Sequence, residues 1–235
     1  MILLRLLLER GELGVSEGAA HLGVAPSTAH RLLATMADHG FVAQTRSRRY
    51  RAGELLTGGG EPRNRNAAIA ATLRPVVQSL FEAVGETVHL MVLVGSDIQF
   101  IDGVEGGQAL RIGLRLGGRL PAYCTSGGKA ILAELDDRLV AAMHVAGVPS
   151  WPGQRIHTLD ELRRELAEVR GSQIAVNRGE SELGVRALGA AVGPAGGRPV
   201  AALTISLPAE RFGSAHRKEL AVELLKAKAQ ATALL

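Results

Sequence analysis

The sequence predicts a two-domain chain of the α/β (α+β) class, in which a small helical domain precedes a larger domain built on a mainly antiparallel sheet. Three observations predict this class. Apolar residues recur at helical spacing within residues 2–36. A glycine-rich and then polar stretch, 53–66, follows them and indicates a domain boundary. Beyond it, strand-like runs alternate with helical ones, and 235 residues suffice for two cores.

The chain begins with an aliphatic run that Arg5 interrupts. The run is too short to span a bilayer, and no small-residue cleavage pattern follows it. We therefore expect neither a signal peptide nor a membrane partner. Helical spacing within the run predicts a first helix whose inner face carries Ile2, Leu3, Leu6 and Leu7.

Composition narrows the possible classes of function. The hydrophobic fraction is 46% but aromatic residues make up only 3%, so the cores must be aliphatic. A formal net charge of +4 permits an anionic partner without requiring one. The single cysteine, Cys124, excludes an internal disulfide and favours a reducing cytoplasm. The histidines lack the close pairing of metal sites, so we expect no metal and no cofactor.

Residues 26–40 predict a helix with one apolar and one polar side. Helical spacing places Ala29, Leu32, Leu33 and Met36 on the apolar side. The polar side carries short hydroxyls and longer donors, which are the groups that contact phosphates and base edges in DNA: Ser27, Thr28, His30, Arg31 and Thr35. Pro26 suits the first turn of such a helix, and Gly40 suits the residue after its last turn.

The neighbours of this helix favour a DNA-binding interpretation. A shorter helix, 16–22 with Ser16 as its N-cap, leads through the turn 23–25 into residue 26, which is the layout of a helix-turn-helix. Two short strands then flank a basic hairpin, as in the wing of a winged helix. We expect phosphate contacts from Arg46, Arg48 and Arg49. Taken alone, the helix would be an ordinary surface helix and the arginine run a solvated turn.

The C-terminal part predicts helices and strands in alternation. Residues 66–84 are helical, but Pro75 means that this helix either kinks or gives way to a second one. It either carries dimer contacts or only covers the sheet that follows. Strands are predicted at 88–94, 98–104, 110–114, 174–176, 185–192 and 199–207, and helices at 138–145, 159–170 and 217–234.

The stretch 120–135 combines small residues with the start of a helix. Free backbone N–H groups at such a start, together with the helix dipole, can bind a carboxylate. Gly127, Gly128 and Lys129 are superficially similar to a phosphate-binding loop. That interpretation fails because the Walker A spacing is absent and Ala130 stands where Ser or Thr would bind magnesium.

Together these stretches resemble the IclR-type family of bacterial transcriptional regulators. The resemblance rests on STAHRLLATMADHGFV, GETVHLMVL, LPAYCTSGGKAILAEL and GESELGVRALGAAVGPAGGRPVAALTIS, which follow the family's order and spacing. It implies a winged helix-turn-helix domain (1–58), a linker and dimerisation helix (59–74) and a GAF-like effector-binding domain (75–235). It also implies a cytoplasmic protein that binds double-stranded operator DNA as a homodimer or a dimer of dimers, under the control of a small organic acid or aromatic effector.

The resemblance further implies an effector pocket built from separate segments. Ser126 and Gly127 would offer backbone N–H groups to a carboxylate. Apolar walls and hydroxyls would come from Ile112, Leu120, Val185, Thr204 and Ser206. Two positions depart from the family pattern: Asn177 stands where members that bind small keto acids tend to have Asp, and Ala187 replaces a frequent Cys. These changes remove a charge and a thiol, so no specific ligand is transferred. Glu180 matches a family glutamate beside the pocket.

Two other classes of function compete with this one. An enzyme would use Cys124 as its nucleophile and His89, His144 or His157 as the base. A lone cysteine is more often a small buried hydrophobe, and no oriented third partner is evident, so we expect no catalytic residues. The other alternative is a small-molecule sensor whose DNA binding is impaired because the first helix is short.

Overall fold

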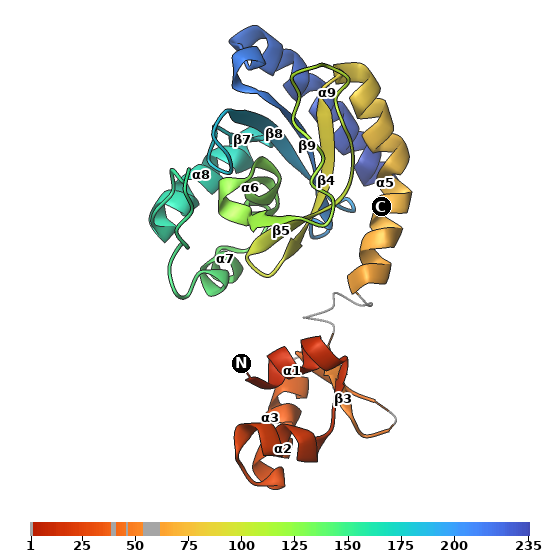
Figure 1. Cartoon of the computed structure of the whole chain (residues 1–235), viewed down its shortest axis with the longest axis vertical. Coiled ribbons are helices and arrows are strands. Elements are labelled where there is room, and N and C mark those ends of the chain that lie inside the picture. The colour runs from red at the N-terminus through yellow and green to blue at the C-terminus, as the bar shows by residue number, and fades with distance from the viewer. Residues whose placement is uncertain (1, 39–40, 46, 54–61) are drawn as a thin grey trace. The chain divides into compact units, whose positions relative to one another are not determined.

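The computed structural model describes residues 2–38, 41–45, 47–53 and 62–235 (Figure 1). The predictions made for Gly40 and Arg46 lie outside these residues. Contacts within the chain divide it into two compact units, Met1–Arg65 and Asn66–Leu235.

Within its described residues, the N-terminal unit combines three helices with a small sheet. The helices are α1 (Ile2–Arg10), α2 (Val15–Leu22) and α3 (Pro26–Asp38), and the antiparallel strands are β1 (Glu12–Leu13), β2 (Val42–Gln44) and β3 (Tyr50–Ala52), in the order β1-β3-β2. This arrangement confirms the helix-turn-helix and the two strands of the wing. Strand β1 was not predicted, because two residues carry no periodic pattern.

The start of α2 differs from the prediction. The helix begins at Val15, and the capping position is Gly14 rather than Ser16. Glu17 reaches back from the first turn, where its carboxylate accepts a hydrogen bond of 2.9 Å from the Gly14 N–H. A glutamate three residues after the cap thus supplies the return bond of a capping box, while Gly14 has no side chain to cap the first turn. Gly23 ends α2 in the left-handed conformation, with φ 66°.

The core of this unit confirms most of the predicted apolar positions. It consists of Leu3, Leu6, Leu7, Leu13, Leu33, Val42 and Tyr50, and Ala29 is also fully buried. Two predicted core residues were wrong: Ile2 is 47% exposed and Leu32 is 44% exposed. Leu32 lies one helical step, about 100°, from Leu33, and that step carries it to the edge of the buried stripe.

The C-terminal unit is built on a six-stranded antiparallel sheet in the order β6-β5-β4-β9-β8-β7. The strands are β4 (Thr87–Val94), β5 (Asp97–Val104), β6 (Arg119–Pro121), β7 (Ala175–Asn177), β8 (Val185–Val192) and β9 (Ala201–Pro208). Its helices are α5 (Pro62–Val84), α6 (Ser126–Ala133), α7 (Asp137–Met143), α8 (Leu159–Ser172) and α9 (Ser214–Leu234). Helices α5 and α9 cover one face of the sheet, while α6 lies on the other with α8 packed beside it (Figure 1).

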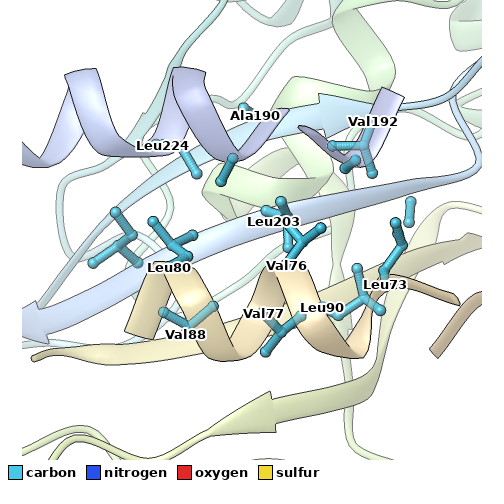
Figure 2. Packing of buried hydrophobic residues seen from close by; sticks show 14 of the residues in the cluster. Leu73, Val76, Val77, Leu80, Val88, Leu90, Ala190, Val192, Leu203 and Leu224 are labelled. Atoms are coloured by element: carbon cyan, nitrogen blue, oxygen red, sulfur yellow. The ribbon is translucent and has the colours of Figure 1, made fainter. Parts of the chain in front are cut away.

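Helix α5 runs unbroken through Pro75, so the alternative of two helices was wrong. Its inner side packs Leu73, Val76, Val77 and Leu80 against β4, β9 and α9 (Figure 2). By length and composition the segment Arg65–Val84 could cross a membrane. Its large apolar side chains instead fill the aliphatic core of this unit, as the helical spacing predicts.

The predicted strand 110–114 was also wrong. Residues 105–118 form an irregular segment, and the edge strand is β6 instead. Side chains bind the backbone of this segment: Thr87 Oγ1 donates to the Ile112 carbonyl at 2.5 Å, and Arg211 donates to the Leu110 carbonyl at 2.8 Å. These bonds take the place of a strand ladder.

Candidate functional site

The outer side of α3 presents polar groups to solvent. Ser27, Arg31 and Thr35 recur every four residues along it, and all three are exposed. Thr28 is half-buried beside them. Thr35 Oγ1 donates to the Arg31 carbonyl at 2.9 Å, so this hydroxyl stays close to the helix backbone. The predicted polar side is therefore a continuous exposed ridge with Arg31 as its longest donor.

His30 lies on the flank of this ridge that faces the wing. Its side chain is exposed, and its ring meets Tyr50 of β3 edge to face, with ring centroids 6.4 Å apart. Tyr50 is buried in the core of the unit. On the opposite flank, Leu32 adds an exposed apolar group that the sequence pattern had placed in the core.

The wing arginines have different surroundings. Arg48 is exposed and adopts a left-handed backbone conformation, with φ 59°. Arg49 instead forms ion pairs with Glu17 at 2.8 Å and Glu12 at 3.4 Å. The Gly14 N–H and then Arg49 hold the pKa of the Glu17 carboxyl below its ordinary value. Arg51 is exposed on β3 and extends the basic surface, although the prediction did not include it.

A small cavity of about 30 Å³ lies in the C-terminal unit between the sheet and the start of α6. Seven of the nine predicted effector residues line it: Ile112, Leu120, Ser126, Asn177, Val185, Ala187 and Ser206. The lining also includes residues that sequence reasoning missed: His89, Met91, Phe100, Arg115, Thr125, Ser181 and Glu182. The sequence did contain a signal for His89. It is a lone histidine in the apolar strand β4, where alternate residues share one face of the sheet.

The other two predicted residues, Gly127 and Thr204, lie beside the cavity rather than in its wall. A Cβ at Gly127 would come within 2.9 Å of Thr204 Cγ2 and 2.6 Å of Met91 Sδ. A Cβ at Gly189 on β8 would likewise come within 2.5 Å of the Ser126 backbone. The first turn of α6 can therefore approach the sheet this closely only because both positions are glycine.

The start of α6 retains free backbone donors. Thr125 is its N-cap, and its Oγ1 accepts a hydrogen bond of 3.0 Å from the Gly128 N–H. The N–H groups of Ser126 and Gly127 belong to the first turn, where no helical carbonyl can accept from them. Ser126 lines the cavity and Gly127 lies beside it, so the first turn of α6 borders the cavity.

His89 is the most perturbed titratable group of the cavity. It is 1% exposed, and its ring packs edge to face against Phe100 with centroids 4.9 Å apart. Burial, and then the positive charge of Arg115, lower the pKa of this imidazole to about 4. The Gly113 backbone and Glu105 act in the opposite direction but are outweighed. His89 is therefore neutral at pH 7.

An ion pair closes part of the cavity wall. Arg115 comes from the irregular segment 105–118 and pairs with Glu182, which comes from the loop 178–184 between β7 and β8. The side chains of Arg115 and Glu182 are 38% and 48% exposed, so the pair lies between the cavity and solvent. It is the most exposed polar contact among the residues that line the cavity.

Asn177 uses its amide within the loop that follows it. Its Oδ1 accepts from the N–H groups of Gly179 at 2.8 Å and Glu180 at 3.0 Å, and its Nδ2 donates to Ser181 Oγ at 2.5 Å. An Asn at this position thus shapes the turn as an Asx motif does. Its predicted role was effector contact, and in this structure the amide is already occupied.

A buried ion cluster lies behind the same loop. Lys129 of α6 is 0% exposed, and its Nζ donates to Glu180 at 2.8 Å and to Glu165 of α8 at 2.7 Å. Burial alone would raise the pKa of the Glu165 carboxyl, but the hydrogen bond and charge of Lys129, with Arg178, hold it below its ordinary value. The family glutamate at position 180 therefore ties the loop to α6 and α8.

Cys124 lies in surroundings unsuited to a nucleophile. It is 1% exposed, and its thiol donates to the Pro121 carbonyl at 3.2 Å. Burial, and then the charge of Glu180, raise the pKa of the thiol to about 12. At neutral pH the side chain is a protonated thiol, whereas a nucleophile must be a thiolate.

Two family models match the chain. The model described as IclR helix-turn-helix domain matches residues 1–46, and the model described as bacterial transcriptional regulator IclR C-terminal matches residues 64–233. The chain belongs to the IclR family of transcriptional regulators. The IclR-family resemblance stated from the sequence is thereby confirmed, together with the winged helix-turn-helix and the antiparallel C-terminal domain.

Individual IclR-family relatives agree with this assignment. The chain is 31% identical to the acetate operon repressor of Salmonella typhimurium, over 94% of this chain and 82% of the relative. It is 30% identical to the transcriptional repressor IclR of Escherichia coli, with the same coverage. The crystal structure of the Thermotoga maritima IclR superimposes with a TM-score of 0.66 at 28% identity, over 98% of this chain and 94% of that one.

Membership of the IclR family decides between the classes of function raised from the sequence. The protein is a DNA-binding transcriptional regulator and not an enzyme. The alternative that Cys124 is a catalytic nucleophile is therefore wrong, in agreement with the raised pKa of its thiol.

Proposed function

We propose that this IclR-family protein is a cytoplasmic regulator that binds a palindromic operator as a homodimer or a dimer of dimers. We propose further that the cavity beneath α6 takes a small organic acid, which changes the affinity for DNA. A ligand can do so only if it binds two states of the protein with different affinities. The first proposal rests on the exposed ridge of α3 and the second on the free donors at the start of α6.

The ridge supports DNA reading because its longest donor is central and unobstructed. Arg31 is exposed between Ser27 and Thr35, and arginine is the side chain that most often makes paired hydrogen bonds with guanine in the major groove. The flanking hydroxyls suit phosphate contacts. His30 lies toward the wing, where Arg48 is also exposed.

Arg31→Ala tests this role in DNA recognition. An operator is first selected with the wild-type protein from a pool of random duplexes, and affinity is then measured by fluorescence anisotropy. We expect about 5- to 150-fold weaker binding and relaxed preference at one base position, as for loss of a paired base contact. Arg217→Ala is a matched control, because Arg217 is exposed on α9 in the other unit. Unchanged affinity and preference in Arg31→Ala would refute the role.

Ser126→Trp tests the cavity. The indole would occupy the space in front of the free N–H groups, so we expect loss of the calorimetric signal for any acid that the wild-type protein binds. Retained binding to the selected operator shows that the variant is folded. Normal binding of the acid by this variant would mean that the effector binds elsewhere.

A further inference from the structure

Two buried polar residues beside the start of α6 lack hydrogen-bond partners. His89 and Thr204 are 1% and 0% exposed. Within the part of the chain that the structure describes, neither His89 ring nitrogen has a partner in hydrogen-bond geometry, although the Gly113 backbone lies near the ring, and Thr204 Oγ1 has no partner either. His89 and Thr204 are direct cross-strand neighbours on β4 and β9, so both side chains leave the same face of the sheet. Buried polar atoms left unpaired cost free energy, and three of them side by side indicate a group that arrives from outside.

The chemistry of these atoms defines the missing group. A neutral imidazole carries one N–H donor and one acceptor nitrogen, whichever tautomer is present. The Thr204 hydroxyl can likewise donate and accept. A hydroxyl group on a ligand can satisfy the acceptor nitrogen and also accept a bond from one of the two donors. A ketone oxygen only accepts, so it would leave the acceptor nitrogen of His89 unpaired.

The start of α6 lies close to His89 and Thr204 and can bind a second group of the ligand. Gly127 packs directly over Thr204, since a Cβ there would come within 2.9 Å of Thr204 Cγ2. The free N–H groups of Ser126 and Gly127 suit a carboxylate. Because these donors and the His89–Thr204 pair meet at one end of α6, the carboxylate and the hydroxyl must be close together on the ligand.

We propose that the cavity binds a short 2- or 3-hydroxycarboxylic acid and discriminates against the corresponding keto acid. The hydroxyl bonds to His89 and Thr204, and the carboxylate bonds to the first turn of α6. This inference rests on the proposed effector function and adds the chemical class of the ligand.

The size of the cavity agrees with selection for a hydroxyl. Its volume of about 30 Å³ holds about one or two water molecules, so an acid enters only if the wall moves, and we assign that movement to the partly exposed Arg115–Glu182 pair. A ligand group that displaces water from a polar site keeps its affinity only if it reproduces both the donor and the acceptor bonds of that water. A hydroxyl meets this condition and a ketone does not.

Calorimetry on the full chain with matched acids tests the inference. The pairs are lactate and pyruvate, 2-hydroxybutyrate and 2-oxobutyrate, and 3-hydroxybutyrate and acetoacetate. We expect the hydroxy acid to bind at least tenfold more tightly than its keto partner in at least one pair. Equal or tighter binding of the keto acid in every pair would overturn the inference and leave the proposed effector function standing. If none of the six acids binds, the inference and the proposed effector class both fail, whereas DNA binding is unaffected.

Two nearly isosteric variants show whether these residues carry the discrimination. His89→Phe keeps an aromatic ring against Phe100 but removes both nitrogens, and Thr204→Val keeps the shape but removes the hydroxyl. We expect each to bring the ratio of hydroxy-acid to keto-acid affinity close to one. Thr204→Ser is the matched control, because it retains the hydroxyl and should keep the ratio. A tenfold ratio that persists in both His89→Phe and Thr204→Val would overturn the assignment of these residues.

Discussion

The ridge of α3 and the cavity beneath α6 are assembled in opposite ways. The ridge comes from nine consecutive residues of one helix, Ser27–Thr35, and its polar groups face solvent. The cavity takes its wall from all six strands of the larger sheet, from the start of α6 and from two irregular segments, and most of its polar groups are buried. A surface of the first kind depends little on the rest of the fold, whereas a cavity of the second kind exists only when the whole unit is correctly packed.

The charged residues of the ridge and those beside the cavity also differ in their exposure to solvent. Arg31 and Arg48 are solvated, so their interactions with a partner are weakened by salt. Lys129 and Glu180 are buried, with 0% and 2% exposed side chains, so removing either one leaves the other as an unpaired buried charge. Substitutions on the ridge should therefore change DNA binding without unfolding the protein. Substitutions of the buried charges beside the cavity should instead lower the stability of the C-terminal unit.

The largest effect is expected from Lys129→Met, which leaves Glu180 and Glu165 without their buried partner. Loss of one member of a buried pair costs about 3–5 kcal/mol of unfolding free energy. Trp151 is the only tryptophan and lies in the C-terminal unit, so its fluorescence during denaturation follows that unit alone. Lys226→Met is the control, since Lys226 pairs with Glu223 while 63% exposed. A loss below about 1 kcal/mol in Lys129→Met would show that the carboxylates find other partners.

A smaller effect is expected when the effector-free protein is acidified. The folded pKa of His89, about 4, lies below the ordinary value of 6.5, so the unfolded chain takes up the proton first as the pH falls. Stability should therefore fall between pH 6.5 and 4, by about 3 kcal/mol at about 1.4 kcal/mol per pH unit. The lowered pKa of Glu165 adds a loss of the same sign below pH 4.5.

His89→Phe separates these two contributions, because the loss due to Glu165 remains in the variant. Unfolding of wild type and variant is followed by Trp151 fluorescence at several pH values. We expect the difference in stability between the two proteins to be constant at pH 7 and above and to change as the pH falls below 6.5. Parallel pH profiles for the two proteins would mean that His89 is accessible to protons in the folded state.

The two wing arginines that the structure describes should contribute differently to DNA binding. The sequence predicts phosphate contacts from both Arg48 and Arg49, but only Arg49 is paired with Glu17 and Glu12. Arg48→Ala should weaken binding uniformly across DNA sequences and lower the slope of log affinity against log salt by about one. Arg49→Ala should leave that slope nearly unchanged. An equal loss of slope in both variants would show that Arg49 leaves Glu17 to bind a phosphate.

The smallest effect is expected from Glu182→Gln at the mouth of the cavity. The Arg115–Glu182 pair is partly exposed, and such pairs contribute little, so its loss should speed ligand association by up to about fivefold. Stopped-flow measurement of Trp151 fluorescence is a suitable readout, because Trp151 Nε1 donates to Ser181 in the same loop at 2.9 Å. If association is slower in the variant, Glu182 contributes to binding rather than to closure.

Local sequence patterns predicted the helices and strands better than they predicted which residues contact one another. The strand 185–192 appears in the structure with the predicted bounds, and the helices predicted at 159–170 and 66–84 appear as the slightly longer α8 and α5. The strand 110–114 failed because its alternation is real but its backbone bonds go to Thr87 and Arg211, which are distant in sequence. Ser16 failed as a cap because the helix begins one residue earlier, at Val15, with Gly14 in the capping position.

The sequence by itself determined the helix-turn-helix, most of the strands and helices and the polar ridge, because each follows from periodicity within a single segment. The tertiary structure alone decided that Arg49 is paired and that His89 and Thr204 lie side by side without hydrogen-bond partners. The physical reason is that strand register and close packing join residues more than one hundred positions apart, and no local pattern records which of them meet.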